Sequence, residues 1–203
     1  MSPPVHIGLF AKYPEPGEVK TRLEPLLGQQ GCAKLAYYLI ARSLELLAQV
    51  QCNGQAVKVV LWADGGTEQQ WHTLFNQLAP HALPIPDLQL QPQGHLGQRM
   101  QHALQWQLAQ SGPGAASALV GADAIGLTAP ILQHLLHAAS QTHAPAFVPA
   151  LDGGYVAIAL QSLHKTVFSE AIDWGTATVM QTTLARLNKA QLNTRGVARL
   201  CRP

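Results

Sequence analysis

The stretch FAKYPEPGEVKTRL occupies residues 10–23, and its first two residues end an apolar run of strand length at residues 5–11. Two prolines in it disfavour a helix, because proline fixes φ and lacks an N–H donor. Its glycine lets a ligand approach the main chain closely. A strand that ends in a loop of this kind favours an α/β fold, in which ligands bind beyond the carboxyl ends of the strands.

Three cations of this loop, Lys12, Lys20 and Arg22, offer charged donors to phosphate oxygens. If they converge beside the end of the strand, they suit a diphosphate. The residues alone leave open an alternative interpretation, an ordinary exposed loop whose charges are solvated. The loop is not a Walker A motif, because the pattern G-x-x-x-x-G-K-[ST] is absent.

Apolar runs of strand length alternate with helical patterns along the chain. Strands are predicted at residues 5–11, 57–63, 87–91, 116–121, 146–149 and 155–160. Helices are predicted over about 31–50, 67–78, 128–139 and 176–187, where Thr67 with Gln70 forms a capping-box pattern and Thr128 precedes a proline as an N-cap. The alternation predicts an α/β fold with a mostly parallel mixed sheet and helices on both faces.

Composition limits the class of protein. The chain has 203 residues, 47% of them apolar and only 12% charged, and a net charge of +2, which is too small for a general hold on nucleic acid. No signal peptide or run of about 20 apolar residues is visible, so a protein without a membrane span is expected. The odd number and wide spacing of the cysteines favour reduced cytoplasmic thiols at Cys32, Cys52 and Cys201. No break in composition suggests a second domain, so a single domain is expected over residues 1–203.

Asp123 follows the predicted strand at residues 116–121 and precedes a predicted helix. Mg²⁺ needs one or two carboxylates in addition to substrate phosphates, and the end of a strand holds such a ligand rigidly. Asp123 could equally be a turn residue that bonds its own backbone.

The tripeptide Asp152-Gly153-Gly154 stands directly before the predicted strand at residues 155–160. Its glycines would let a ligand approach the main chain, and Asp152 could share a metal with Asp123. The alternative is a hairpin turn, for which Asp-Gly is a common signal.

Two further segments carry polar or aromatic groups near predicted helix starts. The sequence GHLGQRM at residues 94–100 is a glycine-spaced turn that opens a helix, where free N–H groups and Arg99 could meet an anion. The sequence IDWGT at residues 172–176 offers an aromatic face and a carboxylate. An ordinary helix start and a tryptophan packed in the core are the respective alternatives.

Five motifs, in this order, resemble the bacterial transferase family labelled DUF2064, or selenodomain-associated transferase 1, within the nucleotide-diphospho-sugar transferase (GT-A) superfamily. They are F-A-K-x-P-x-P-G-x-V-K-T-R-L at residues 10–23, G-x-L-G-x-R-M at 94–100, G-x-D-x-x-G-L-T at 121–128, D-G-G-Y at 152–155 and W-x-T at 174–176. The first motif is long and specific, and the likeness covers most of the chain.

The resemblance implies a nucleotide-binding half over about residues 1–125, an acceptor half over about 126–203, and a diphosphate site assisted by Mg²⁺ or Mn²⁺. Asp123 would hold the metal, Asp152 would be a second ligand or an acceptor-side base, and Lys20 would join them in catalysis. Nucleotide-binding residues would be Phe10, Ala11, Lys12, Pro16, Gly17, Lys20, Thr21, Arg22, Gly94, His95, Leu96, Arg99 and Gly121. Acceptor-side residues would be Gly153, Gly154, Tyr155, Asp173, Trp174 and Thr176.

The sequence departs from the family pattern in three places. His95 stands where the family tends to have Asp, Ala124 and Ile125 stand where it has Cys-Pro, and residues 192–203 lack the carboxylates of an acidic tail. A lost carboxylate could remove a contact to the acceptor or an orienting group.

Three functions follow as hypotheses. The first is metal-dependent glycosyl transfer from a nucleoside-diphosphate sugar to a small-molecule acceptor. The second is nucleotidyl transfer, which joins a nucleotide to a phosphorylated small molecule and releases pyrophosphate. The third is a nucleotide-binding protein without turnover, which His95 and the altered Ala124-Ile125 motivate.

Overall fold

The computed structural model describes residues 4–52, 54–78, 85–168 and 172–192. Its centre is a six-stranded sheet, which confirms the predicted α/β fold. The six predicted strands all form, within one or two residues of the expected bounds. They are β1 (His6–Lys12), β4 (Lys58–Asp64), β5 (Asp87–Leu90), β6 (Ser117–Gly121), β7 (Ala146–Pro149) and β8 (Tyr155–Leu160).

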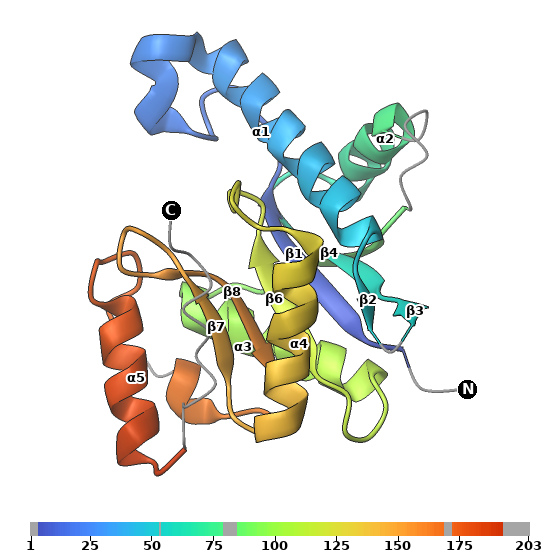
Figure 1. The fold of residues 1–203 in the computed structure, drawn as a ribbon. Coiled ribbons are helices and arrows are strands. Elements are labelled where there is room, and N and C mark those ends of the chain that lie inside the picture. The colour runs from blue at the N-terminus through green and yellow to red at the C-terminus, as the bar shows by residue number, and fades with distance from the viewer. Residues whose placement is uncertain (1–3, 53, 79–84, 169–171, 193–203) are drawn as a thin grey trace.

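The strand order is β5-β4-β1-β6-β8-β7 (Figure 1). Neighbours among β5, β4, β1 and β6 are parallel, whereas β8 is antiparallel to both β6 and β7. The chain adds β4 and β5 on one side of β1 and then crosses to place β6 on the other side. The order therefore reverses between β1 and β6, and in open α/β sheets the ligand crevice lies at such a switch point.

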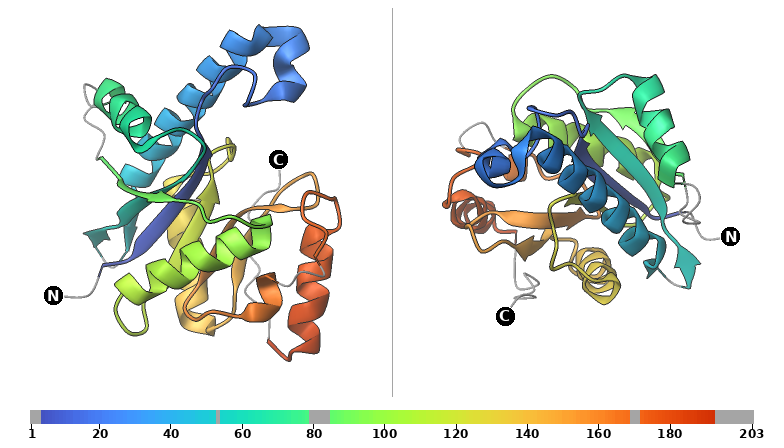
Figure 2. Two further views of the ribbon diagram at one scale, coloured as in Figure 1. Left: turned by 180° about the vertical axis from the view of Figure 1, so that it is seen from behind. Right: turned by 90° about the horizontal axis from the view of Figure 1, so that it is seen from above.

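Helices cover both faces of the sheet, as the sequence pattern predicts. The core on one face unites apolar side chains of the sheet with those of α1 (Glu24–Ala48), α2 (Glu68–Leu78) and α4 (Ala129–Thr142). The core on the other face includes α3 (Leu96–Gln110), the 3-10 helix η3 (Lys165–Phe168) and α5 (Val179–Lys189). Figure 2 shows α3 lying across this second face in the view from behind.

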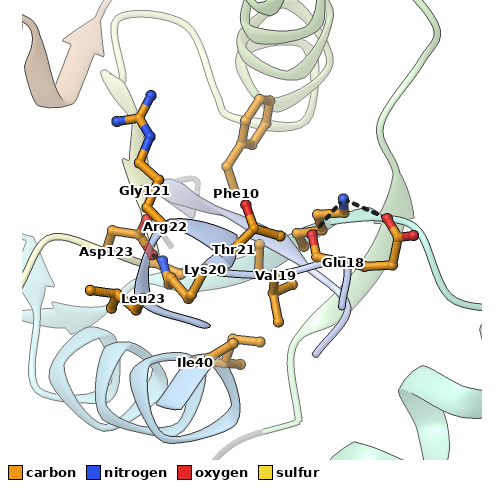
Figure 3. Close-up of a pocket in the computed structure, with 14 residues that line it drawn as sticks. Phe10, Glu18, Val19, Lys20, Thr21, Arg22, Leu23, Ile40, Gly121 and Asp123 are labelled. Atoms are coloured by element: carbon orange, nitrogen blue, oxygen red, sulfur yellow. Dashed lines mark hydrogen bonds and ion pairs between the residues drawn. The ribbon is translucent and has the colours of Figure 1, made fainter. Parts of the chain in front are cut away.

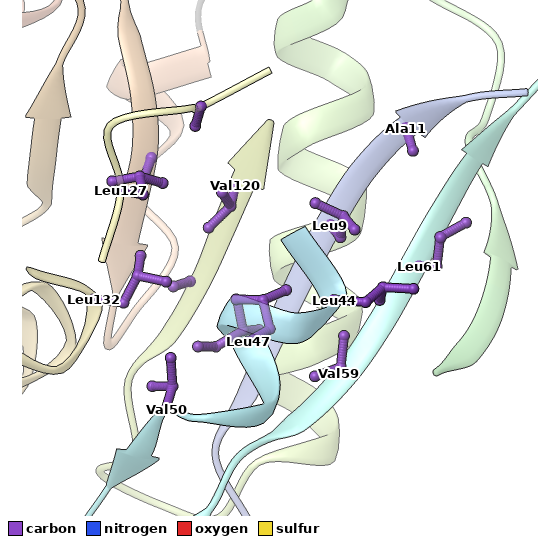
Figure 4. Packing of buried hydrophobic residues seen from close by; sticks show 14 of the residues in the cluster. Leu9, Ala11, Leu44, Leu47, Val50, Val59, Leu61, Val120, Leu127 and Leu132 are labelled. Atoms are coloured by element: carbon purple, nitrogen blue, oxygen red, sulfur yellow. The ribbon is translucent and has the colours of Figure 1, made fainter. Parts of the chain in front are cut away.

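Alternation along the strands sends neighbouring side chains to opposite cores. Leu9 and Ala11 of β1 face α1, and Leu61 of β4 packs beside Leu44 on the same side (Figure 4). Val60 and Trp62 of β4 belong to the other core. Because both faces are buried, the parallel strands read as continuous apolar runs instead of alternating ones.

The two predicted helix caps differ in their hydrogen bonds. The capping box of α2 is confirmed, because Gln70 N donates to Thr67 Oγ1 at 3.2 Å and Thr67 N donates to Gln70 Oε1 at 2.7 Å. The predicted N-cap of α4 is confirmed in position, because Thr128 precedes the helix with extended backbone, although its side chain makes no capping hydrogen bond.

The helix predicted from residue 31 begins earlier, at Glu24, directly after the 3-10 helix η1 (Thr21–Leu23). Gly28 interrupts the helical backbone with φ 65° and ψ 167°, so α1 is kinked near its start. Figure 1 shows this start and the preceding loop projecting beyond the end of the sheet. A short hairpin of β2 (Gln51–Cys52) and β3 (Gln55–Ala56) was not predicted either.

Two other expectations concern cysteines and membranes. Cys32 and Cys52 are free thiols, and Cys201 lies outside the described residues. In the described part of the chain, no helix combines the length and the apolar character needed to cross a bilayer.

Candidate functional site

The carboxyl ends of three neighbouring strands meet at one edge of the sheet. The register pairs Lys12 of β1 with Asp64 of β4, and Phe10 of β1 with Gly121 of β6. Ala122 N donates to Phe10 O at 3.0 Å and prolongs the contact between β1 and β6 beyond the last paired residue. This edge is the switch point of the sheet, and two pockets open on it.

The larger pocket has a volume of about 620 Å³ and lies between the loop after β1, the middle of α1 and the end of β6 (Figure 3). It brings together the three loop cations and Asp123. Its lining residues are Phe10, Ala11, Lys12, Glu18, Val19, Lys20, Thr21, Arg22, Leu23, Ala36, Ile40, Gly121, Ala122 and Asp123. We call it the phosphate pocket, after the ligand predicted for the three loop cations.

Lys20 forms an ion pair with Asp123 across 103 residues of sequence. The backbone of Lys20 is left-handed, with φ 53°, a conformation uncommon for a residue other than glycine. The Lys20 side chain is only 21% exposed, whereas the Asp123 side chain is 73% exposed. The loop therefore holds an ammonium group against a carboxylate that remains open to solvent, and Figure 3 shows the two side chains facing each other.

The other two loop cations differ in their surroundings. Lys12 donates to Glu18 O at 2.9 Å and pairs with the Glu18 carboxylate at 3.3 Å, which fixes the loop against the end of β1. Arg22 is exposed and makes no ion pair with any described residue. Its guanidinium is therefore available to an anionic ligand.

A smaller pocket of about 230 Å³ adjoins the first and shares Phe10, Gly121 and Asp123 with it. Its remaining lining is apolar except for the Tyr155 hydroxyl and comes from α3, β6, the turn after β6 and β8: Leu96, Met100, Leu119, Val120, Ala124, Tyr155, Val156, Ala157 and Ile158. We call it the acceptor pocket, after the acceptor-side role predicted for Tyr155.

His95 caps α3. Its Nδ1 accepts from Gln98 N at 3.4 Å, and Gln98 Oε1 accepts from His95 N at 3.1 Å. An aspartate would accept the same backbone N–H, so His95 keeps the capping function at the position where it departs from the family pattern.

Tyr155 and Trp174 pack together near this cap. Their ring centroids are 6.4 Å apart and the rings meet edge to face. The indole of Trp174 also lies over Gly97 in the first turn of α3. Burial raises the pKa of the Tyr155 hydroxyl above its ordinary value, so it stays protonated at neutral pH.

Arg99 and Asp152 line neither pocket. Arg99 pairs with Asp64 at 3.3 Å and donates to Gln91 Oε1 at 3.0 Å, which ties the start of α3 to the end of β4. Asp152 lies in the turn between the antiparallel strands β7 and β8, where its Oδ1 accepts from Gly154 N at 3.1 Å. The hairpin interpretation of this tripeptide is therefore the one that describes its structure.

Of the predicted site residues, the structure gathers Phe10, Ala11, Lys12, Lys20, Thr21, Arg22, Gly121 and Asp123 in the phosphate pocket, and Leu96 and Tyr155 in the acceptor pocket. The others line neither: Pro16, Gly17, Gly94, His95, Arg99, Asp152, Gly153, Gly154, Asp173, Trp174 and Thr176. Gly17 has φ 81° and shapes the loop instead. Thr176 Oγ1 donates to Asp173 O at 2.8 Å in the segment before α5.

Sequence reasoning missed several lining residues. Glu18 and Val19 lie inside the quoted loop motif, and the basic partner of Glu18 six residues earlier was a usable signal. Ala36 and Ile40 come from the buried face of α1, and nothing in their helical pattern distinguishes a pocket wall from core.

A metal site on protein ligands alone is not visible. Among the described residues, no group of three or more His, Cys, Asp or Glu side chains could hold a metal ion. Asp123 offers one exposed carboxylate at the phosphate pocket, which fits a hard cation held mainly by phosphate oxygens and water.

The fold belongs to the class seen in nucleotide-diphospho-sugar transferases. A protein from Desulfovibrio desulfuricans G20, proposed to be such a transferase, superposes with a TM-score of 0.78 and 29% sequence identity over 95% of this chain and 78% of its own. A 4-diphosphocytidyl-2C-methyl-D-erythritol synthase shares the fold with a TM-score of 0.52 at 11% identity, over 98% of this chain and 94% of its own. Among curated proteins, no match is found.

Residues 46–176 match the model of DUF2064, described as "Uncharacterized protein conserved in bacteria", and the chain belongs to this family. The matched range contains the motifs at residues 94–100, 121–128 and 152–155, together with the last motif at 174–176. The loop at residues 10–23 lies outside this range.

Proposed function

We propose that this chain is a transferase that takes a nucleotide-activated donor, and that it transfers a sugar from a nucleoside-diphosphate sugar to an acceptor hydroxyl. The observation that carries the proposal is the phosphate pocket, where Lys12, Lys20, Arg22 and Asp123 lie together at the switch point of the sheet. The likeness to the Desulfovibrio protein supports the choice of donor.

The charges of the pocket suit a leaving nucleoside diphosphate. As the bond to the sugar breaks, negative charge builds on the diphosphate, and positioned cations stabilise that charge more than they stabilise the ground state. Arg22 can bind two phosphate oxygens at once through its guanidinium, whereas Lys20 contributes a compact charge. Lys12 is occupied by Glu18 and serves to hold the loop in shape.

The ion pair of Lys20 with Asp123 gives the site a ligand-dependent exchange of partners. A diphosphate entering the pocket offers Lys20 a doubly charged acceptor, so that the ammonium can leave the exposed Asp123 carboxylate. Asp123 would then hold Mg²⁺ or Mn²⁺ together with the phosphates, and the metal would supply further neutralisation of the leaving group.

The two pockets divide donor from acceptor. The phosphate pocket is lined by the loop cations and the acceptor pocket mostly by apolar side chains, and Phe10, Gly121 and Asp123 border both. The acceptor hydroxyl would approach the sugar from the smaller pocket, close to the only carboxylate that the described residues place in its wall.

The test is a product assay with nucleoside-diphosphate sugars and Mg²⁺ or Mn²⁺. We expect release of free nucleoside diphosphate, slow with water as acceptor, and its loss in Asp123→Asn. Lys34→Met, which removes an exposed cation of α1 outside both pockets, is the matched control and should leave release unchanged.

Two results would contradict glycosyl transfer. Release of pyrophosphate from a nucleoside triphosphate in place of diphosphate release would indicate nucleotidyl transfer. Binding of nucleotides with no turnover of any donor or triphosphate would indicate a nucleotide-binding protein that has lost catalysis.

A further inference from the structure

Two main-chain carbonyls on either side of Asp123 accept hydrogen bonds from side chains of α1. Ser43 Oγ donates to Ala122 O at 3.3 Å, and Arg42 Nη2 donates to Ile125 O. These contacts join residues that lie 79 and 83 positions apart in the chain. The turn that carries the candidate metal ligand is therefore attached to α1 both before and after that ligand.

The restraints within the turn itself are local. Ala124 N donates to Gly121 O at 3.2 Å, Ile125 N donates to Asp123 O at 2.9 Å, and the Ala124 side chain is buried. Asp123 and Ile125 are exposed, so their own side chains add little packing. Glycines at positions 121 and 126 flank the turn, and glycine has the greatest backbone freedom of any residue. Contacts from outside the turn therefore restrain the direction of the Asp123 side chain.

Arg42 supplies the stronger of the two contacts from α1. Within the described ranges no carboxylate pairs with Arg42, so its guanidinium is free to serve Ile125 O. A hydrogen bond from a charged donor is roughly twice as strong as one between neutral groups. Neither Arg42 nor Ser43 lines the phosphate pocket or the acceptor pocket. Both residues therefore act on the turn and not on a ligand.

The same face of α1 also contacts the loop that carries Lys20. Cys32, which is fully buried, donates from Sγ to Lys20 O at 3.4 Å. Cys32 and Ser43 are about three helical turns apart, or about 16 Å along the helix axis. Ala36 and Ile40 lie between them and line the phosphate pocket, where Figure 3 shows Ile40 on the helix. One helix face thus contacts the backbone at both members of the ion pair in this pocket.

We propose that Arg42 and Ser43 are positioning residues for the Asp123 carboxylate. They keep the turn in place after Lys20 has left Asp123 for a diphosphate, when the ion pair no longer restrains the carboxylate. The inference rests on the proposed function for the ligand that takes Lys20 away. A carboxylate that is already in place binds a metal–diphosphate complex without a further loss of backbone freedom, and this raises the affinity for that complex.

The first test measures hydrogen exchange of backbone amides in the intact chain by NMR, without nucleotide. Lys20→Met removes the ion pair and represents the state in which Lys20 has left. We expect the Ala124 and Ile125 amides, which donate within the turn, to stay within about twofold of their wild-type exchange rates in Lys20→Met. Adding Arg42→Met should speed both at least about tenfold, because a charged hydrogen bond is lost, while the amides of β1 keep their rates.

Three further variants, each also combined with Lys20→Met, identify the cause. Ser43→Ala removes only a hydroxyl and should speed the same amides about two- to tenfold, the range of one neutral hydrogen bond. Arg42→Lys keeps a charged donor and should restore part of the protection that Arg42→Met removes. Lys34→Met is the matched control, because it removes an exposed cation of the same helix, and it should change neither amide.

The second test is calorimetric titration with ADP, CDP, GDP and UDP, with and without Mn²⁺. Arg42→Met should reduce the gain in affinity that Mn²⁺ provides at least about tenfold, because the metal depends on Asp123. The affinity without metal depends on the loop cations and should equal that of the wild type. A residue with only a structural role would weaken both affinities alike.

The outcomes separate this inference from the proposed function. Turn amides that open in Lys20→Met alone, that do not respond to Arg42→Met, or that speed up together with those of β1 overturn the inference. An equal loss of affinity with and without Mn²⁺ in Arg42→Met also overturns it. A wild-type chain that binds no diphosphate contradicts the proposed function, and the exchange rates then still decide whether Arg42 and Ser43 hold the turn.

Discussion

Among the glycines that the structure describes, Gly153 tolerates a side chain least. A Cβ built there would lie 2.0 Å from Ala177 O and 2.6 Å from the Ala177 carbonyl carbon, both main-chain atoms that cannot rotate away. Side-chain Cβ atoms essentially never approach another atom closer than 3.0 Å, so the hairpin and the segment before α5 would have to separate by about 1 Å.

That separation also breaks a hydrogen bond. Met180 N donates to Gly153 O at 2.9 Å and attaches the first turn of α5 to the hairpin. Its loss costs about 1 kcal/mol, the positive φ of 88° adds about 1–2 kcal/mol for alanine, and overpacking adds a similar amount. We expect Gly153→Ala to lower the free energy of unfolding by about 3–5 kcal/mol.

Gly114→Ala is the matched control for backbone strain. Gly114 has φ 82°, but its nearest neighbour to a new Cβ is Gln161 Nε2 at 3.8 Å, an ordinary contact. It should cost only the strain, about 1–2 kcal/mol. In a chain of this length 1 kcal/mol corresponds to about 2–4 °C in Tm, so calorimetry should show a loss of about 10 °C for Gly153→Ala and a few degrees for Gly114→Ala. Equal losses in the two variants would refute the argument from the Ala177 contact.

Three further predictions concern the site, the pH dependence and a helix cap. Asp123→Ala should abolish metal-dependent nucleotide binding. It should change the free energy of unfolding by less than about 1 kcal/mol, because the carboxylate is 73% exposed. An unchanged nucleotide affinity in calorimetry would count against the metal role of Asp123. Burial, and next the charge of Lys58, lowers the pKa of His6 in the folded chain. The unfolded chain therefore binds a proton at His6 more readily than the folded chain does. The His6 contribution to stability is complete above about pH 6.5, and it is lost as the pH falls below that value. Urea unfolding between pH 7 and pH 5 should show a flatter dependence in His6→Gln than in the wild type and in the control His134→Gln, and equal slopes would exclude His6 as the cause. Thr67→Ala should lower the free energy of unfolding by about 1 kcal/mol, because it removes the capping box of α2. Thr73→Ala, inside the same helix, should leave the free energy of unfolding unchanged. Equal denaturation midpoints for the two variants would contradict the role of the cap.

The framework of the fold could be predicted because its signals are local. Six apolar runs gave six strands, and the segment from Thr67 to Gln70 gave a cap that the structure contains. The start of α1 could not be placed, because Gly28 and Pro25 in its first turns usually end helices, whereas here the proline occupies the first turn and the glycine forms a kink.

The site was harder to predict from the sequence than the fold, because its contacts join distant parts of the chain. The loop motif suggested three converging cations, but the ion pair of Lys20 with Asp123 spans 103 residues and depends on a left-handed backbone at Lys20 that no local pattern indicates. The position of Trp174 over Gly97 is likewise a product of packing between the segment before α5 and α3. The tripeptide Asp152-Gly153-Gly154 is the opposite case, because its local pattern predicted either a hairpin turn or a metal site, and the structure contains the hairpin turn.

The central claim is that the loop after β1 binds a nucleoside diphosphate through its cations. The most direct measurement is calorimetric titration of the intact chain with ADP, CDP, GDP and UDP in the presence of Mg²⁺, repeated in Arg22→Gln, Lys20→Met and the control Lys34→Met. We predict that at least one diphosphate binds, that Arg22→Gln and Lys20→Met each weaken it at least about tenfold, and that Lys34→Met does not. Binding of none of the diphosphates, or equal affinity in Arg22→Gln and the wild type, would contradict the claim.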